Sequence, residues 1–341
     1  MAEQDKLIEV RDLKVSFFTP AGEVKAVDGI SYTLGPNEVM GVVGESGSGK
    51  SVEAYSIIGL LQSPGKVIGG SITFEGEDLL AYTPEQMRQF RGNKVSMIFQ
   101  NPMTCLNPVY TIGNQLMEAL LCHDRSISRE QAWKRSVKML DEVGINNPEK
   151  RMKQYPHEFS GGMRQRAMIA MALICKPKLL IADEPTTALD VTIQAQILEL
   201  MKKLQREEGT SIIFITHNLG VVAEICDRVS VMYAGKIIEQ GKVNDIFYHP
   251  QHPYTKGLLA SMPRLDEDGH ERLIPIEGTP IDLLNPPKGC NFAPRCSECR
   301  RICLRAKPGF TDLGDGHISA CWLHQMQKDG RPDAGKEAPG T

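Results

Sequence analysis

The sequence predicts an α/β fold, because apolar segments of strand length alternate with segments of helical periodicity. Three apolar segments carry this prediction: residues 39–43 (VMGVV), 179–182 (LLIA) and 211–216 (SIIFIT). Each ends where glycine or polar residues begin. Segments of this kind are typical of strands in a parallel sheet that is buried on both faces.

A glycine-rich loop follows the first apolar segment. Residues 44–51 (GESGSGKS) match the pattern G-x-x-x-x-G-K-S and precede a run, residues 52–61, that is compatible with a helix. Glycines let backbone NH groups turn inward around phosphate oxygens, Lys50 adds a cation, and Ser51 is placed to hold magnesium. A plain glycine-rich turn is the alternative. The full match between a strand and a helix favours a phosphate-binding loop.

Length and composition bound the protein class. At about 150 residues per domain, 341 residues predict two domains, or one domain with an extension. With 41% hydrophobic and 24% charged residues most of the chain should fold, and a net charge of -3 gives no reason to expect a polyanion as the main partner. No signal-peptide pattern is present and the apolar run 167–175 is too short to span a bilayer. We expect a cytoplasmic protein that reaches a membrane through partners.

Further strands are predicted on both sides of the loop. Residues 7–34 read as strand, turn and strand, with Phe17 and Phe18 at the end of the first strand. Either ring could stack on an adenine, or simply pack in the core. Residues 71–74 are also strand-like, and residues 94–102 (KVSMIFQNP) read as an apolar strand that ends in a polar residue and a proline. Gln100 therefore lies at a strand terminus, where α/β folds bind ligands. A surface glutamine that begins a loop is the alternative.

Two stretches have helical character. In residues 111–156, Ser128 and Gln131 form a capping-box pattern, and one face carries Trp133, Val137, Leu140 and Val143. Farther on, Ser160, Gly161 and Gly162 open a helix that Pro177 stops. The free NH groups at such a helix start could meet an anion, although the same residues also make an ordinary helix cap.

Polar side chains end the two later apolar strands. Asp183 and Glu184 follow residues 179–182, where Asp183 could reach magnesium and Glu184 could polarise an attacking water. An accidental pair of loop carboxylates is the alternative. His217 follows residues 211–216 and could contact a terminal phosphate, or be structural. Between them, residues 190–209 predict an amphipathic helix that ends at Gly209.

In combination these segments resemble the ATP-binding cassette (ABC) ATPases. The resemblance rests on GESGSGKS, Gln100, FSGGMRQR at 159–166, LLIADE, the turn 188–190 and His217, in the order and spacing of the family. It implies a RecA-like P-loop NTPase core with an antiparallel β subdomain and an inserted helical subdomain at about 111–170. Residues 1–250 would then form the nucleotide-binding domain.

The resemblance also implies the roles of individual residues. Phe17 would stack on adenine, with Phe18 as the alternative. Glu184 would be the catalytic base, assisted by Gln100 and His217, and Mg²⁺ would be held through Ser51, Gln100 and Asp183. ATP would lie on the loop and helix start formed by Gly44, Glu45, Ser46, Gly47, Ser48, Gly49, Lys50, Ser51 and Val52.

Members of this family sandwich ATP head to tail between two subunits. The signature at 160–163 would therefore contact ATP held by a partner subunit, and Asp190 would lie in the loop that contacts the partner. This sequence departs from the commoner pattern at Met163 and in the loop residues Asn101 and Cys105. Neither change removes a group that hydrolysis needs.

The C-terminal part resembles one subfamily. YHPQHPYTKGLL at 248–259 and GCNFAPRCSECRRIC at 289–303 look like the extension of the ATPase subunits of oligopeptide, dipeptide and nickel importers. With NPMTCLNP and DEPTTALDVTIQAQ, they are most similar to the D-type subunit. Residues 251–327 would form the extension, and the tail 328–341, which lacks apolar periodicity, is expected to be disordered.

Five of the nine cysteines lie in this extension. In a cytoplasmic protein, clustered thiols favour metal or redox chemistry over disulfides, and the residues alone leave zinc, an iron-sulfur cluster and free thiols open. The resembling family repeats the spacing of Cys290, Cys296, Cys303 and Cys321 and holds a 4Fe-4S cluster there. The resemblance therefore implies a structural 4Fe-4S cluster, with Cys299 additional.

The resemblance implies an ATPase that powers import of oligopeptides or dipeptides from the cytoplasmic face of the inner membrane. Its expected partners are a second ABC ATPase subunit, two transmembrane permeases and, through them, an external solute-binding protein. Two alternatives remain: import of nickel or another small solute, and a soluble ABC ATPase that acts on nucleic acid or the ribosome. The acidic net charge, the single cassette and the importer-type extension disfavour the latter.

Overall fold

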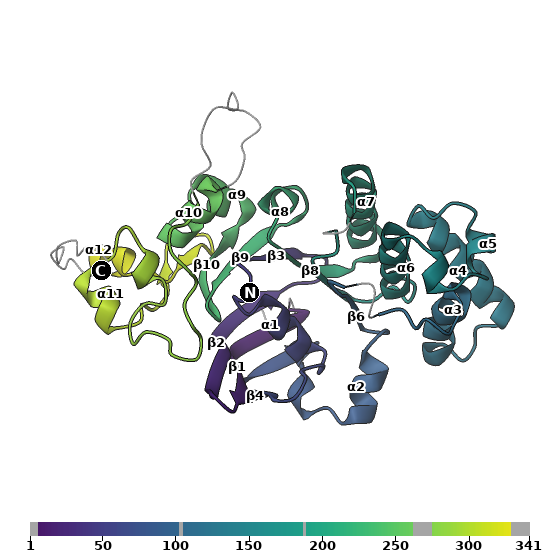
Figure 1. The fold of residues 1–341 in the computed structure, drawn as a ribbon, viewed down its shortest axis with the longest axis horizontal. Helices are drawn as coiled ribbons and strands as arrows, with labels where there is room; N and C mark the ends of the chain where they lie inside the picture. The colour runs from purple at the N-terminus through teal and green to yellow at the C-terminus, as the bar shows by residue number, and fades with distance from the viewer. Residues whose placement is uncertain (1–5, 102–104, 187–188, 262–274, 329–341) are drawn as a thin grey trace. The chain divides into compact units, whose positions relative to one another are not determined.

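The fold is given by a computed structural model that describes residues 6–101, 105–186, 189–261 and 275–328 (Figure 1). The chain forms two compact units, each built from stretches far apart in the sequence. The first unit comprises the described residues of Met1–Ile8, Leu34–Val39 and Phe74–Ile215. The second comprises those of Glu9–Thr33, Met40–Thr73 and Thr216–Thr341.

The first unit contains a parallel sheet in the order β8-β7-β6, made of β6 (Val95–Ile98), β7 (Leu179–Asp183) and β8 (Ser211–Thr216). In register, Ile98 pairs with Ala182 and Asp183 pairs with Ile215. All residues of these strands are buried, as their apolar sequences predicted. Because the strands are parallel, their carboxyl ends meet at one edge of the sheet.

Helices make up most of the rest of the first unit. Figure 1 shows α3, α4, α5 and α6 grouped together, and α3, α4 and α6 pack on one another. The elements outside the sheet are β5 (Glu77–Asp78), the 3-10 turns η2 (Leu79–Ala81) and η3 (Pro156–Glu158), and the helices α2 (Pro84–Phe90), α3 (Ile112–His123), α4 (Arg129–Glu142), α5 (Pro148–Arg151), α6 (Gly161–Leu173) and α7 (Val191–Glu208).

Helix α4 confirms the predicted capping box. The Ser128 hydroxyl accepts a hydrogen bond from the Gln131 NH at 3.2 Å, and the Gln131 side chain accepts one from the Ser128 NH at 2.9 Å. The buried face lies slightly to one side of the predicted one. Its residues are Ala132, Ser136, Met139, Leu140 and Val143, with Trp133 and Val137 half-buried at the border.

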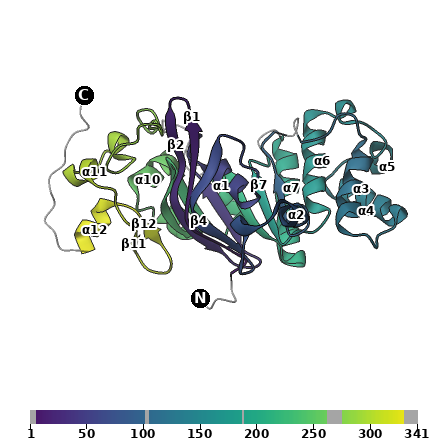
Figure 2. The same cartoon turned by 90° about the horizontal axis from the view of Figure 1, so that it is seen from below.

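The second unit contains two sheets. Figure 2 shows β1 (Ile8–Thr19), β2 (Gly22–Leu34) and β4 (Gly65–Phe74) side by side, in the order β2-β1-β4. The predicted strand, turn and strand over residues 7–34 is thus confirmed. Strand β4 begins at Gly65, well before the predicted residues 71–74. Its first half, residues 65–69, contains two glycines and no fully buried residue, so it lacks the apolar pattern that predicts a strand.

The other sheet of this unit joins the phosphate-loop strand to the C-terminal segment, which we define as residues 275–328. Its order is β11-β12-β10-β9-β3. Strand β3 (Val39–Val43) is parallel to β9 (Arg228–Tyr233), and β10 (Lys236–Lys242) is antiparallel to both β9 and β12 (Ile318–Ser319). Strand β11 (Thr311–Asp312) completes the edge.

Short helices complete the second unit. They are α1 (Lys50–Ile57), α8 (Leu219–Ile225), α9 (Val243–Tyr248), α10 (Pro253–Ala260), the 3-10 turn η4 (Ala293–Arg295), α11 (Arg301–Arg305) and α12 (Trp322–Lys328). Across all the described ranges, every helix is too short or too polar to span a membrane. The tail predicted to be disordered lies outside the described residues beyond Lys328.

Candidate functional site

The predicted phosphate-binding loop joins β3 to α1 in the second unit. Gly44, Gly47 and Gly49 have positive φ angles of 152°, 76° and 101°. A Cβ at Gly44 would lie 2.1 Å from the Met232 carbonyl oxygen, and one at Gly49 would lie 2.4 Å from that of Ala26. Both positions therefore require glycine for conformation and for space.

Lys50 lies within the curve of this loop and is 7% exposed. Its Nζ donates hydrogen bonds to the carbonyl oxygens of Gly44 at 2.8 Å and Glu45 at 2.9 Å. The amine is thus held among the backbone groups that the sequence predicted to surround phosphate oxygens. Ser51 and Val52 follow in the first turn of α1, and both are half-buried.

Two predicted residues of the first unit meet at the carboxyl edge of its sheet. The Gln100 Nε2 donates a hydrogen bond to the Glu184 Oε2 at 2.8 Å. Asp183 ends β7 and is 1% exposed. Glu184 has a positive φ of 47°, and its NH donates to the Ile215 carbonyl at 2.9 Å. A non-glycine residue in this conformation at the end of a strand is typical of a functional turn.

The signature residues open helix α6 in the first unit. Ser160 is the N-cap residue, and its hydroxyl accepts a hydrogen bond from the Met163 NH at 3.4 Å. Ser160 and Gly161 are exposed, and a Cβ built at Gly161 would have no heavy atom within 4 Å. This helix start therefore has room for a ligand. The side chain of Gln165, farther along α6, donates to the Pro185 carbonyl at 2.6 Å, a link to the Glu184 loop that the sequence did not indicate.

The remaining predicted ATP-site residues are Asp190, in the first unit, and His217, Phe17 and Phe18, in the second. Asp190, in the first unit, caps α7 by accepting a hydrogen bond from the Ile193 NH at 3.0 Å. In the second unit, His217 is exposed just after β8. Phe17 is half-buried, and its ring lies so close to Gly65 that a Cβ there would be 2.7 Å away, whereas Phe18 is 49% exposed.

The two loop departures from the family pattern interact with each other. The Cys105 thiol donates a hydrogen bond to the Asn101 carbonyl oxygen at 3.2 Å. The contact bridges the ends of the stretch 102–104, whose own structure is not described.

Cys290, Cys296, Cys303 and Cys321 gather in the C-terminal segment. Burial is the main cause that raises the pKa of Cys290 and Cys296 to about 12 and that of Cys321 to about 11. The charge of the neighbouring thiolates raises each of these pKa values further. Across the described residues, however, no group of three or more cysteine, histidine or acidic side chains has the arrangement of a metal site. The thiols are assembled, but not in a ligand geometry.

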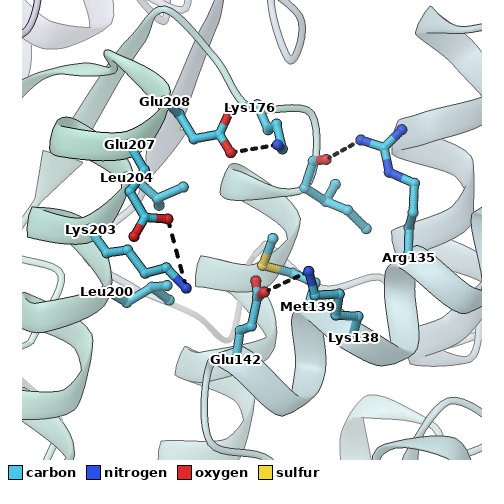
Figure 3. A pocket seen from close by; sticks show the side chains of 11 residues that line it. Arg135, Lys138, Met139, Glu142, Lys176, Leu200, Lys203, Leu204, Glu207 and Glu208 are labelled. Carbon is cyan, nitrogen blue, oxygen red and sulfur yellow. Dashed lines mark hydrogen bonds and ion pairs between the residues drawn. The ribbon is translucent and has the colours of Figure 1, made fainter.

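A cavity of about 490 Å³ lies in the first unit, away from the predicted site residues (Figure 3). Helix α4 contributes Met139 and α7 contributes Leu200 and Leu204 to its apolar wall. Charged residues surround it, with ion pairs between Lys176 and Glu208 at 2.5 Å and between Lys138 and Glu142 at 3.5 Å. These charges pair with each other, so the cavity indicates a solvated seam between two amphipathic helices.

Sequence reasoning missed two side chains that touch the phosphate-binding loop. Arg295 and Tyr254 both bond to Glu45, from more than 200 positions away in the chain. An arginine beside Cys296 and a tyrosine in α10 carry no local signal for such a contact.

Comparisons with known proteins give matches along most of the chain. Residues 27–187 match the family model described as ABC transporter, and residues 238–303 match that described as Oligopeptide/dipeptide transporter, C-terminal region. The chain is 56% identical over 326 residues to the dipeptide transport ATP-binding protein DppD of Bacillus subtilis (strain 168), covering 95% of this chain and 97% of that protein. It is 55% identical over 316 residues to the oligopeptide transport ATP-binding protein OppD of Salmonella typhimurium, covering 93% of each.

Solved structures share the fold. One is the dimeric post-hydrolysis state of the ATP-binding cassette MJ0796 bound to ADP and phosphate, with a TM-score of 0.64 and 24% identity. The match covers 69% of this chain and 98% of that one. This likeness confirms the predicted α/β core of RecA-like type.

Proposed function

Because the chain belongs to the family of ATP-binding subunits of oligopeptide and dipeptide ABC transporters, we propose that it hydrolyses ATP to power peptide import across the cytoplasmic membrane. The observation that carries this proposal is that more than half of the residues, over nearly the whole chain, are identical to those of DppD and OppD. The relatives named as dipeptide and oligopeptide transport ATP-binding proteins favour peptides over nickel as cargo.

ATP binding is proposed for the loop from Gly44 to Val52. The backbone NH groups of the loop and the Lys50 amine would bind the phosphates, and Phe17 or Phe18 would stack on the adenine. Mg²⁺ would be held through Ser51, Gln100 and Asp183, an oxygen-donor set that suits this hard cation. When bound, it would neutralise charge that develops on the phosphates.

Hydrolysis is proposed to depend on Glu184 as general base. The hydrogen bond from the Gln100 amide to the Glu184 carboxylate supports this role, because it orients the carboxylate. His217 would contact the terminal phosphate. These groups place and deprotonate the nucleophile, and the loop's backbone NH groups stabilise the charge that leaves with the phosphate.

A head-to-tail dimer would complete each ATP site. The open helix start at Ser160–Gly161, with Gly162 and Met163 behind it, supports binding of a phosphate presented by a partner subunit. Asp190 would lie at the same interface. The dimeric state of the MJ0796 cassette is consistent with such an assembly, and a second ABC ATPase subunit is the proposed partner here.

Two permeases and, through them, a solute-binding protein are the further proposed partners, with the chain bound peripherally at the cytoplasmic face of the inner membrane. In the first unit, the loop after Gln100 exposes Val109 (71%) and Tyr110 (53%) beside a cavity of about 820 Å³ bordered by α3. Exposed apolar side chains next to a hollow are typical of a protein-docking surface. We propose that a cytoplasmic segment of a permease docks there.

A structural 4Fe-4S cluster is proposed for the C-terminal segment. Its support is the resemblance and the gathering of Cys290, Cys296, Cys303 and Cys321 in one place. The described arrangement does not fit a metal site as it stands, so the thiols would have to turn toward a common centre and lose their protons. No step of ATP hydrolysis is assigned to this group.

Purification of the Glu184→Gln variant from native membranes with ATP present tests the transport proposal. Blocked hydrolysis should preserve the closed assembly, so two multi-span permeases and a second ABC ATPase should co-purify. Recovery of soluble ribosomal or DNA-binding partners without any membrane protein would contradict it. The matched control is Glu199→Gln, which alters an exposed carboxylate on α7.

A further inference from the structure

A buried arginine of the C-terminal segment forms an ion pair with the phosphate-binding loop. The Arg295 guanidinium forms a two-pronged ion pair with the Glu45 carboxylate, through Nη1 to Oε2 at 2.6 Å and Nη2 to Oε1 at 3.0 Å. The arginine side chain is only 3% exposed, whereas that of Glu45 is 27% exposed. A bidentate arginine–carboxylate ion pair that is largely shielded from solvent is among the strong polar contacts in proteins.

Arg295 is itself fixed in place before it reaches the loop. Its Nε donates to the Glu277 carbonyl at 2.9 Å and its Nη2 to the Ile276 carbonyl at 3.2 Å. Its guanidinium also lies 5.8 Å from the ring centre of Tyr233. Because these partners hold the arginine, the ion pair positions Glu45 rather than the reverse.

The backbone of Glu45 is held as well. Its NH donates a hydrogen bond to the Tyr254 hydroxyl at 2.9 Å. Tyr254 is fully buried, with ring-centre distances of 4.7 Å to Tyr233 and 5.4 Å to Phe292 of the C-terminal segment. The side chain and the NH of Glu45 are therefore both fixed by groups outside the loop.

Glu45 in turn determines where Lys50 lies. The Glu45 carbonyl accepts hydrogen bonds from the Lys50 Nζ at 2.9 Å and from the Ser48 NH at 3.2 Å. A shift of Glu45 would move the amine and one of the NH groups proposed to bind phosphate. A small cavity of about 20 Å³ is lined both by the loop and by Pro280, Ile281 and Leu283 of the C-terminal segment. The segment therefore lies next to the loop at a second place besides the ion pair.

We propose that Arg295 is a positioning residue for ATP binding, which acts by holding Glu45 and thereby the phosphate-binding loop in its ATP-binding conformation. This inference rests on the proposed ATPase function and assigns part of the ATP site to the C-terminal segment. Without the ion pair the loop samples other conformations, and the fraction that can bind ATP falls. Affinity for ATP should then decrease more than turnover of bound ATP.

The test compares Arg295→Gln with Arg305→Gln in the full-length chain. Arg305 is exposed in the same segment and serves as the matched control. Binding of MgATP is measured by calorimetry, and steady-state hydrolysis gives KM and kcat. We expect Arg295→Gln to raise Kd and KM by about tenfold with kcat nearly unchanged, whereas Arg305→Gln matches the wild type. Arg295→Lys keeps the positive charge but cannot form the bidentate ion pair, so its Kd and KM for MgATP should lie between those of the wild type and Arg295→Gln.

A double-mutant cycle distinguishes this role from a general loss of packing. Glu45→Gln should weaken MgATP binding in the same way, and Arg295→Gln/Glu45→Gln should be no worse than either single variant. If Arg295→Gln fails to fold, Glu45→Gln alone carries the test, since it leaves the arginine's other bonds in place. The proposal would be overturned if the folded variants bound MgATP as tightly as the wild type. It would also be overturned if the losses of binding free energy in the two single variants added up in the double variant. A wild-type chain that neither binds nor hydrolyses ATP would instead overturn the proposed function.

Discussion

Gln100 and Glu184 are joined by a hydrogen bond of 2.8 Å from the Gln100 amide to the Glu184 carboxylate. The two residues follow different strands of one parallel sheet, β6 and β7, and lie 84 positions apart in the chain. The resemblance to ABC ATPases implied that both take part in ATP hydrolysis, and their contact places an orienting amide against the proposed base. The hydrolytic chemistry proposed for the first unit is therefore centred on this pair.

Replacement of Glu184 by glutamine tests the proposed base. The carboxamide cannot accept a proton from water, so ATP hydrolysis should fall by about 10²- to 10⁴-fold. Binding of MgATP should persist, because the phosphate-binding loop is unchanged. Phosphate release and calorimetric binding measure the two effects, with Glu199→Gln as control. Wild-type hydrolysis by Glu184→Gln would show that another group is the base.

Of two glycine-to-alanine changes, one should destabilise the fold and the other should leave it unchanged. Gly49→Ala forces a φ of 101° and places a Cβ 2.4 Å from the Ala26 carbonyl oxygen, so it should destabilise the second unit by about 1–3 kcal/mol or more and abolish ATP binding. Gly161→Ala meets no heavy atom within 4 Å and should fold like the wild type. Thermal denaturation checks both expectations.

The same Gly161→Ala variant also tests the dimer proposal. Its methyl group would project from the helix start that is proposed to meet the partner's phosphate, so hydrolysis should fall although each chain is stable and still binds ATP on its own loop. Measurement of hydrolysis against protein concentration would reveal the weakened dimer. Full activity in Gly161→Ala would argue against a close phosphate contact at this position.

His252 should make the protein sensitive to acid. Burial, aided by the charges of His324 and Lys256, lowers the pKa of His252 from 6.5 to about 3. The unfolded chain binds a proton near pH 6.5 and the folded chain does not, so stability falls as the pH drops below 6.5, by about 2 kcal/mol between pH 7.5 and pH 5. Urea unfolding at both pH values measures this change.

A matched variant isolates the His252 contribution. In the wild type, the His252 Nδ1 accepts a hydrogen bond from the Tyr254 NH at 3.0 Å. His252→Asn keeps an acceptor for this NH and removes the titrating group. Its stability should vary less with pH than that of the wild type or of His249→Asn, a change on the surface. An identical pH dependence in all three proteins would exclude His252 as the cause.

Replacement of Cys296 tests the proposed cluster. Protein prepared without oxygen should contain iron and sulfide and absorb visible light, and Cys296→Ser should lose both properties because a four-thiolate site needs four ligands. Cys122→Ser, which alters an exposed thiol in the first unit, should keep them. Equal iron and sulfide in the wild type and Cys296→Ser would rule out this ligand set.

Local signals in the sequence predicted most of the fold. Apolar runs located β3, β7 and β8, and the capping pattern of Ser128 and Gln131 located the start of α4, because such signals depend on near neighbours. The buried face of α4 was shifted, since Ser136 is fully buried despite its polarity: its hydroxyl donates to the Ala132 carbonyl at 2.8 Å. A polar residue satisfied within its own helix is invisible to a hydrophobic pattern.

Long-range contacts limited the prediction of the site. The motifs identified Glu45 and Glu184. They did not indicate that Arg295 bonds to Glu45, or that Gln165 bonds to the carbonyl of Pro185, the residue after Glu184. Such pairs depend on how β-strands and loops assemble, which local periodicity does not encode. The arrangement of the four thiols is unpredictable for the same reason, because spacing along the chain fixes neither their rotamers nor their common centre.

Uptake of a labelled peptide into proteoliposomes tests the central claim most directly. The vesicles would hold the permeases, the second ATPase and this chain, with the solute-binding protein on the opposite face. We predict ATP-dependent accumulation of a di- or oligopeptide with the wild-type chain, and none with Glu184→Gln in its place. Peptide accumulation that persists without ATP, or accumulation of nickel but of no peptide, would contradict the account.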